Sequence, residues 1–408
     1  MKLNRLEMSI GKSAEYFKTQ TKIAKILGIS FVENESTSYW LYSRLLIIFF
    51  SVCYPIVAVR ELFLHEFDVI ANMIMYTFGI FIGLAKTIII VLNRVRIGKM
   101  LEKLERIPFI LNLERGGKKE EELINRCLLI TKAQTYTYYG LGSVTLIAGF
   151  MFTIVRRITS SDYHDWEFAY GPITILNITY SPNYEITLLY QNLSIIWIGY
   201  HFVTADLLVA DILVHISFQF KMLQNNFKRI LPIALKKQQT EENSLLQSTL
   251  ERKELLSSSI KWEYLKKSLE ETVTYHLEIL NMAGEIEELC NGLLLFVFMS
   301  TLGMLCFIIY RASSLSLGDT QLMRNIFEGL SISLQVLIIC YWGQQVTNES
   351  ELVANSVFDT NFEGTDLKFQ KALKLSMIRS QKPTSITAGK FADVGLPTFA
   401  WVNMLKIV

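Results

Sequence analysis

The stretch VIANMIMYTFGIFIGLAKTIIIVL runs from Val69 to Leu92, and it decides the class of fold. Lys86 is its single charged residue. An α-helix rises about 1.5 Å per residue, so roughly 20 apolar residues cross the ~30 Å hydrocarbon core of a bilayer. The stretch therefore predicts a transmembrane helix that carries a lysine inside the membrane.

The rest of the chain has the same character. Of its 408 residues, 51% are hydrophobic and 19% are charged, whereas charged residues make up about a quarter of a typical soluble domain. We predict an all-α membrane protein with seven transmembrane helices. The other six spans are expected at Trp40 to Phe63, Ala133 to Val155, Gln191 to Val214, Leu289 to Tyr310, Ile326 to Val346 and Ile386 to Val408.

Lysine and arginine are distributed unevenly between the two sides of these spans. Of 40 such residues, 33 lie before the first span, at its start (Arg44), or in the connections 93–132, 221–288 and 346–390. Positive charge in short loops is retained on the cytoplasmic side, so the N-terminus is predicted to be cytoplasmic and the C-terminus extracellular. The expected order is a cytosolic segment 1–39, spans one to four in 40–220, a cytosolic helical loop 221–288, and spans five and six in 289–346.

Two charged residues are predicted to meet inside the membrane. Lys86 lies in the second span, and Asp206 lies in the fourth span together with Asp211. A charge at mid-membrane costs about 2.5–3.5 kcal/mol on insertion scales, so it usually has a partner. The depths of Lys86 and Asp206 agree within about 3 Å at 1.5 Å per residue, which predicts an ion pair. The alternative is that Lys86 extends to the inner headgroups.

The sequence shows no metal-spaced His/Cys cluster, no Gly-rich phosphate loop and no nucleophile elbow, so it does not indicate an enzyme, a cofactor or a nucleic-acid partner. Aromatic and aliphatic side chains with a few polar ones occupy the outer halves of four spans. A cavity lined in this way would take a small apolar molecule, although for each residue taken alone helix packing or lipid contact is favoured over ligand binding. The candidate ligand-binding residues are Met73, Tyr76, Thr77, Ile80, Ala148, Phe152, Leu193, Trp197, Tyr200, His201, Phe327 and Leu330.

The longest predicted outer connection, 158–190, contains two further features. Trp166, Tyr170 and Pro172 indicate a folded lid instead of a linker. The triplet that begins at Asn177 could accept an N-linked glycan, although such triplets are also frequent by chance.

The end of the chain carries a succession of short motifs. They are Cys340-Tyr341-Trp342-Gly343, Ser350-Glu351-Leu352-Val353-Ala354, Met377-Ile378-Arg379-Ser380-Gln381-Lys382-Pro383 and Ile386-Thr387-Ala388-Gly389-Lys390-Phe391. Over about the last 70 residues this succession resembles the insect odorant receptor family.

The resemblance implies a ligand-specific odorant receptor subunit in the plasma membrane of olfactory sensory neurons. Such a subunit assembles with the olfactory co-receptor Orco into a heterotetrameric, ligand-gated cation channel. It also implies that 347–385 forms the cytosolic anchor part of the last helix and 386–408 its pore-lining part. The family usually has a Trp near Phe362 and continues past the position of Lys406, so no gate residues are assigned. The candidate pore-helix residues are Val394, Phe399, Val402 and Leu405.

A hinge is predicted between the anchor part and the pore part. Pro383 cannot continue a helix and disfavours helical angles at Lys382. Ala388 and Gly389 are small enough to let helix backbones approach closely at the start of the membrane segment. The hinge residues are therefore Lys382, Pro383 and Gly389.

Two other classes of seven-span protein remain as alternatives. A G-protein-coupled receptor would have the opposite orientation, and neither its Asp/Glu-Arg-Tyr after the third span nor its Asn-Pro-x-x-Tyr in the last is present. A gustatory receptor of the same superfamily would share the channel architecture with a different ligand class, but its Thr-Tyr and Gln-Phe signature in the last helix is missing.

Overall fold

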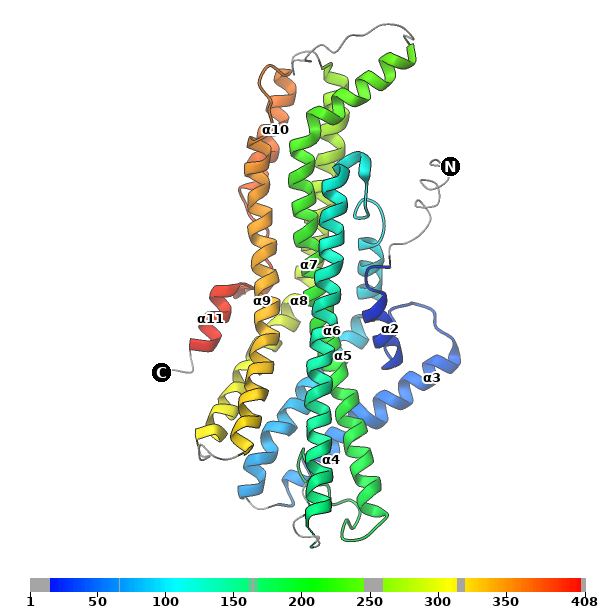
Figure 1. Cartoon of the computed structure of the whole chain (residues 1–408), viewed down its shortest axis with the longest axis vertical. Helices are drawn as coiled ribbons and strands as arrows, with labels where there is room; N and C mark the ends of the chain where they lie inside the picture. The colour runs from blue at the N-terminus through cyan, green and yellow to red at the C-terminus, as the bar shows by residue number, and fades with distance from the viewer. Residues whose placement is uncertain are drawn as a thin grey trace.

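The computed structural model describes residues 15–65, 67–160, 162, 166, 168–245, 260–313 and 320–404. Long helices run side by side along most of the molecule, and a small hairpin and a short helix lie near the C-terminus (Figure 1). The elements are α2 Lys18–Ile26, α3 Thr37–Leu46, the π-helix η1 Ile47–Val52, α4 Cys53–Leu62, α5 Phe67–Leu104, α6 Leu113–Thr159, α7 Asn183–Leu245, α8 Trp262–Ser313, α9 Thr320–Phe358, α10 Leu367–Ser380, β1 Thr387–Ala388, β2 Ala392–Asp393 and α11 Leu396–Met404.

Within the described residues, six helical stretches are long and apolar enough to cross a membrane. They coincide with the first six predicted spans, so the chain is an all-α, multi-pass membrane protein. The six stretches are Thr37–Leu62, Met73–Leu104, Leu113–Thr159, Asn183–Glu241, Trp262–Ser313 and Ile326–Phe358.

Helix α7 lies at the centre of the bundle. From Thr204 to Phe220 every residue is buried, polar ones such as Asp206 and Asp211 included, so this part of α7 is covered on all its faces. Beyond the membrane part, α7 and α8 continue toward the end of the bundle that carries α10 (Figure 1). We call this the α10 end, and we call the opposite one the α4 end.

Helix α10 packs against α9 and α8 at the α10 end. Its buried face contains Phe369 and Leu373, with Met377 partly buried. The first part of the expected anchor segment belongs instead to α9, which runs without interruption to Phe358.

The last predicted span begins differently from the expectation. A hairpin pairs Thr387 with Asp393, and the helix starts at Leu396 and not at Ile386. Gly389 and Lys390 both have φ of 60°, and the Phe391 N–H donates to the Ala388 carbonyl oxygen at 3.1 Å. Two consecutive residues with positive φ make a turn that matches the twist of a β-hairpin, so the backbone cannot be helical there.

We predict that the α10 end loses folding stability in acid because of His276. It lies on α8 with 5% of its surface exposed, and its ring centre is 6.3 Å from that of Phe227. Burial, with a smaller contribution from the positive charge of Arg379, lowers the pKa of His276 to about 4. Between this pKa and about 6.5, the unfolded chain binds a proton that the folded chain excludes, so stability is greatest above pH 6.5 and falls as pH decreases.

We expect the buried His276 to lower the free energy of unfolding by about 2 kcal/mol when the pH falls from 7 to 5. The measurement is thermal unfolding of the detergent-solubilised chain at pH 7 and pH 5, for the parent and for His276→Gln. The parent should lose more stability than the variant on acidification. Equal losses would show that His276 does not contribute.

Candidate functional site

A segment between α6 and α7 closes over the α4 end of the bundle. We call residues 168–174 the lid. The Ala169 N–H donates to Thr153 Oγ1 on α6 at 3.1 Å, and Gln191 Nε2 on α7 donates to the Gly171 carbonyl oxygen at 2.9 Å. Met73 on α5 packs directly against Gly171, since a Cβ there would lie 3.2 Å from Met73 Cγ. The lid is thus bound to three helices.

Aromatic side chains meet where the lid contacts α5. The rings of Tyr76 and Tyr170 are perpendicular, with centres 5.8 Å apart. A Cβ at Gly149 would lie 2.4 Å from the Tyr170 hydroxyl oxygen, so a glycine on α6 leaves the room that Tyr170 fills. From α8, the guanidinium carbon of Arg311 lies 5.7 Å from the centre of the Tyr76 ring. The group combines apolar surface with hydroxyl groups and one cation, which suits recognition of a small, mostly apolar molecule.

The other edge of the lid is held by a buried carboxylate. Glu61 at the end of α4 is 0% exposed. Its Oε1 accepts from the Thr174 N–H at 3.0 Å and its Oε2 from the Thr174 hydroxyl at 2.8 Å. Arg60 Nη1 lies 2.7 Å from Oε1, and His65 Nε2 lies 3.4 Å from Oε2. A buried carboxylate with these partners anchors the lid.

Replacing Glu61 by alanine should loosen the lid. The change leaves the Thr174 N–H and hydroxyl without their acceptor, which costs about 1–3 kcal/mol. Hydrogen exchange of residues 168–176 should accelerate by roughly tenfold for each 1.4 kcal/mol. Glu185→Ala, an exposed carboxylate at the start of α7, is the control and should exchange like the parent. Equal exchange in both variants would contradict the anchoring role.

The twelve predicted ligand residues separate into three groups. Met73, Thr77, Ile80 and His201 are buried, and Tyr76, Phe152, Trp197 and Tyr200 are partly buried. Of these, Met73 and Tyr76 contact the lid. Ala148, Leu193, Phe327 and Leu330 lie on the outer surface of the chain, because the helices turn these positions away from the interior.

Two of the polar candidates on α7, Tyr200 and His201, are already bonded within the chain. A ring nitrogen of His201, Nε2, lies 3.0 Å from the Leu27 carbonyl oxygen. The Tyr200 hydroxyl lies 2.7 Å from Ser143 Oγ. Both contacts favour a packing role. Tyr54 and Ile173, which cluster with Ile80 and Ile198, were not among the candidates, because they lie on the first span and in the lid, outside the four spans considered.

Lys86 and Asp206 lie against each other in the interior. Lys86 Nζ is 2.9 Å from Asp206 Oδ1 and 2.8 Å from Oδ2, and the side chains are 1% and 5% exposed. Lys86 Nζ also lies 3.5 Å from the centre of the Phe202 ring. The amide of Gln335 donates to Asp206 from α9. This cluster, which we call the ionic triad (Lys86, Asp206, Gln335), joins α5, α7 and α9.

A second buried carboxylate joins the N-terminal helix to the bundle. Asp211 Oδ2 accepts from Gln20 Nε2 on α2 at 2.7 Å. Its Oδ1 accepts from Gln134 Nε2 on α6 at 3.3 Å, and Gln134 Oε1 accepts from Trp342 Nε1 on α9 at 2.9 Å. The indole of the Cys-Tyr-Trp-Gly motif is therefore part of a polar chain across four helices.

The hinge and pore candidates lie along the hairpin and α11. After α10 ends at Ser380, the Thr384 N–H donates to Ser350 Oγ at 2.8 Å, which fixes the segment that follows Lys382 and Pro383. The Gly389 N–H donates to the Asn291 carbonyl oxygen at 2.9 Å, and a Cβ at Gly389 would lie 2.5 Å from Leu295 Cδ2. The close approach expected at Gly389 is thus made by a hairpin against α8.

Among the pore-helix candidates, Val394 is buried and Phe399 is partly buried, with α11 beside α9 (Figure 1). The side chain of Val402 and the whole of Leu405 lie outside the described residues. The glycan candidate Asn177 is exposed, and its Oδ1 accepts from the Thr179 hydroxyl at 2.7 Å.

The fold and the site together define a multi-pass helical membrane protein with a lid over an aromatic site. Residues 66–405 match the 7tm Odorant receptor family, and the chain belongs to that family. It therefore belongs to a family of membrane receptors and not to a family of enzymes. The membership favours the odorant receptor interpretation over the gustatory and G-protein-coupled alternatives.

Curated relatives include putative odorant receptor 92a of Drosophila melanogaster, 27% identical over 133 residues that cover 33% of this chain and 32% of the relative. Odorant receptor 67a of the same fly is 25% identical over 134 residues, with 33% of each chain covered. Odorant receptor Or1 of Anopheles gambiae is 20% identical over 260 residues, covering 60% of this chain and 55% of the relative. The first two relatives are thus matched over about a third of their length.

Among solved structures, the insect olfactory receptor OR5 from Machilis hrabei has the same fold. Its structure superposes with a TM-score of 0.76 at 14% identity, over 96% of both chains. Its complex with eugenol superposes with a TM-score of 0.72 over 96% of both chains.

Proposed function

We propose that this chain is the ligand-specific subunit of a heteromeric, odorant-gated cation channel. Its partner would be the olfactory co-receptor Orco, and its place the plasma membrane of olfactory sensory neurons. The observation that carries this proposal is the family match over residues 66–405. The shared fold with an olfactory receptor solved in complex with eugenol supports it.

The proposed ligand is a small hydrophobic volatile that binds beneath the lid. Met73 and Tyr76 from α5 and Tyr170 from the lid supply apolar and aromatic surface, and the Tyr76 and Tyr170 hydroxyl groups supply hydrogen bonds. Because Tyr170 fills the space beside Gly149, a ligand would enter by shifting Tyr170. The ligand shifts the channel toward the arrangement of helices that it binds more tightly. A ligand with equal affinity for the closed and open arrangements would not open the channel.

The orientation follows from charge. The lysine- and arginine-rich segments 93–132, 221–245 and 260–288 belong to the α10 end, and basic loops stay in the cytoplasm. The α10 end and the N-terminus would then be cytoplasmic, and the lid, with the glycan candidate Asn177, extracellular. Helix α11 would begin the pore-lining segment, carried by the hairpin on α8 and α9.

The test is whole-cell current in cells that express this chain with and without the co-receptor, challenged with volatile esters, alcohols, aldehydes and terpenes. A fast cation current that requires the co-receptor and persists under G-protein blockade is expected. Tyr170→Ala should raise the half-activating ligand concentration about tenfold or more, because a loss of about 1.4 kcal/mol of ligand-binding free energy corresponds to a factor of ten. Tyr310→Ala, an exposed tyrosine on α8, should leave it unchanged. A G-protein-dependent response without current, from chain present at the cell surface, would overturn the proposal.

A further inference from the structure

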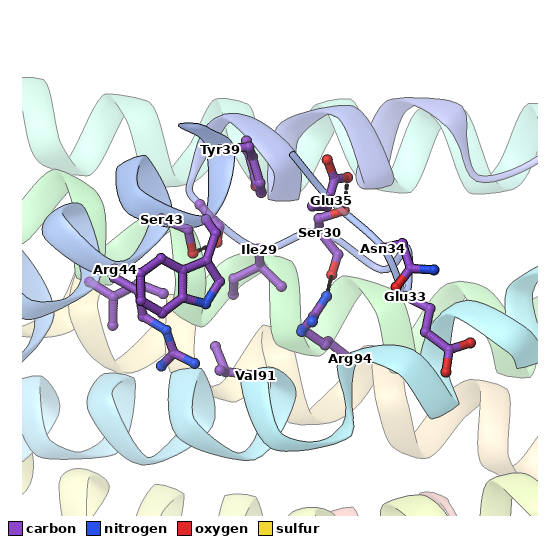
Figure 2. A pocket seen from close by; sticks show the side chains of 13 residues that line it. Ile29, Ser30, Glu33, Asn34, Glu35, Tyr39, Ser43, Arg44, Val91 and Arg94 are labelled. Carbon is purple, nitrogen blue, oxygen red and sulfur yellow. Dashed lines mark hydrogen bonds between the residues drawn. The ribbon is translucent and has the colours of Figure 1, made fainter. Parts of the chain in front are cut away.

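A second site lies far from the lid. A pocket of about 180 Å³ is enclosed by the α2–α3 connection, α3 and α5 (Figure 2). Val91 and Arg94 of α5 line one side, and Trp40 and Arg44 of α3 line the other. Val91 follows Met73 by 18 residues, which places the pocket about 27 Å along α5 from the lid. It is smaller than the roughly 300–1,000 Å³ of a usual small-molecule site, so a headgroup fits it better than a whole ligand.

The walls of the pocket are built by tight backbone contacts. Arg94 Nη1 donates to the carbonyl oxygens of Ser30 at 3.1 Å and Val32 at 2.8 Å. A Cβ at Gly98 would lie 2.1 Å from the Phe31 carbonyl oxygen, so the connection lies directly on α5. These contacts fix the connection in place, so the pocket is preformed and does not depend on a ligand to assemble it.

The pocket lies where a bilayer changes from hydrocarbon to headgroups. The apolar run of α5 ends at Leu92, between Val91 and Arg94. On α3, Trp40, Leu41 and Leu45 each expose more than half of their surface beside the pocket. Tryptophan is enriched at membrane interfaces, and exposed leucines on a membrane-embedded helix face acyl chains. A lipid beside α3 would therefore have its headgroup level with the pocket.

The carboxylates of the pocket lie at one end. Arg44 lies toward the Val91 side, whereas Glu33 and Glu35 lie toward the Arg94 side (Figure 2), where the Arg94 guanidinium already donates to the Ser30 and Val32 carbonyl oxygens. Because α5 runs from Val91 to Arg94 out of the membrane, the Arg44 cation is on the membrane side and the carboxylates are on the solvent side. Within the part of the chain that the structure describes, no carboxylate pairs with Arg44; its guanidinium lies 5.7 Å from the Trp40 ring centre.

The two carboxylates differ in how far they are engaged. Glu35 accepts from Ser30 and from Lys25 Nζ, and these hydrogen bonds lower the pKa of Glu35. Glu33 pairs more loosely, at 3.6 Å from Lys99 Nζ with both side chains mostly exposed. Glu33 is thus the carboxylate best placed to exchange its partner for a ligand cation.

We infer that the pocket binds the headgroup of phosphatidylethanolamine. The phosphate, nearer the acyl chains, would accept from the Arg44 guanidinium, a charge-assisted hydrogen bond. The primary ammonium, farther from the membrane, would donate to the Glu33 carboxylate. An anionic headgroup would meet Glu33 and Glu35 as like charges, and a choline headgroup has no N–H to donate.

The experiment measures lipid binding to the purified full-length chain. The delipidated chain in detergent is titrated with phosphatidylethanolamine, phosphatidylcholine and phosphatidylglycerol of identical acyl chains, and native mass spectrometry counts the bound lipids. The ethanolamine lipid should bind most tightly. Arg44→Gln should weaken its binding about tenfold, and Glu33→Gln should remove its preference over the choline lipid. Arg96→Gln is the control, since Arg96 lies on α5 near Arg94, outside the pocket, and pairs with Glu288.

Three outcomes would overturn the inference. One is tightest binding of phosphatidylglycerol, and another is unchanged binding of all three lipids in both pocket variants. The third is equal affinity for water-soluble glycerophosphoethanolamine, which lacks acyl chains and would identify a site for a free solute. Glu33 is mostly exposed, so Glu33→Gln should fold even if Arg44→Gln does not. The readout uses this chain without a co-receptor, so it is independent of the proposed channel function.

Discussion

Replacing Lys86 by methionine should destabilise the chain by about 3–5 kcal/mol, the usual cost of removing one partner from a buried ion pair. The Asp206 carboxylate would remain buried, with the Gln335 amide as its remaining donor in the ionic triad. The measurement is thermal unfolding in detergent together with the amount of chain at the cell surface. Lys99→Met, an exposed lysine farther along α5, is the control and should behave like the parent.

Exchanging the two charges separates the ion pair from simple packing. Lys86→Asp alone places two carboxylates side by side and should abolish surface expression. Adding Asp206→Lys should restore a large part of it, because an attractive pair forms again between α5 and α7. Gln335 can adapt, since a side-chain amide carries both a donor and an acceptor and can turn its oxygen toward the introduced ammonium group. If the double exchange is no better than the single one, the pair does not hold these helices together.

The Lys86–Asp206 pair can be predicted from the sequence, because the rise per residue of a helix gives the depth of each residue in the membrane. Lys86 and Asp206 are the charges deep in their spans, and matching depths limited the possible partners. Gln335 was not foreseen, since an uncharged amide in an apolar span raises no comparable signal. The role of Glu61 does not follow from the sequence for a related reason. Its partners are the backbone N–H and the hydroxyl group of Thr174 in the lid. The lid is irregular, so no helical periodicity predicts which of its residues face Glu61.

The hairpin before α11 shows a different limit of sequence reasoning. Hydropathy predicts a span from Ile386 onward, and the small size of Gly389 predicts close helix packing. The turn uses Gly389-Lys390, in which the lysine adopts a positive φ that is uncommon for a residue with a side chain. The hydrogen bond to Asn291 and the contact with Leu295 hold this conformation. Such tertiary contacts override local propensity and cannot be inferred from the segment alone.

Replacing Gly343 by alanine should displace the hairpin and greatly reduce odorant-evoked current. A Cβ at Gly343 on α9 would lie 2.3 Å from the Val394 carbonyl oxygen and 2.8 Å from Val394 Cγ1. The oxygen belongs to the backbone between β2 and α11, so it can yield only if the whole connection moves. Overpacking of this kind costs about 1–3 kcal/mol, while alanine in place of glycine would favour α9 itself by up to about 1 kcal/mol. The net strain therefore falls on the hairpin and α11 and not on the helix bundle.

This division of the strain makes the prediction specific. Hydrogen exchange of residues 386–399 should accelerate about tenfold or more in Gly343→Ala, while exchange in α7 and α8 stays as in the parent. Gly284→Ala is the matched control, because Gly284 is also a helical glycine but its Cβ would meet nothing within 4 Å. That change should leave the hairpin unaltered and stabilise α8 by about 0.5–1 kcal/mol. If the two alanine variants show the same exchange over 386–399 and the same current, the contact between Gly343 and Val394 does not position α11.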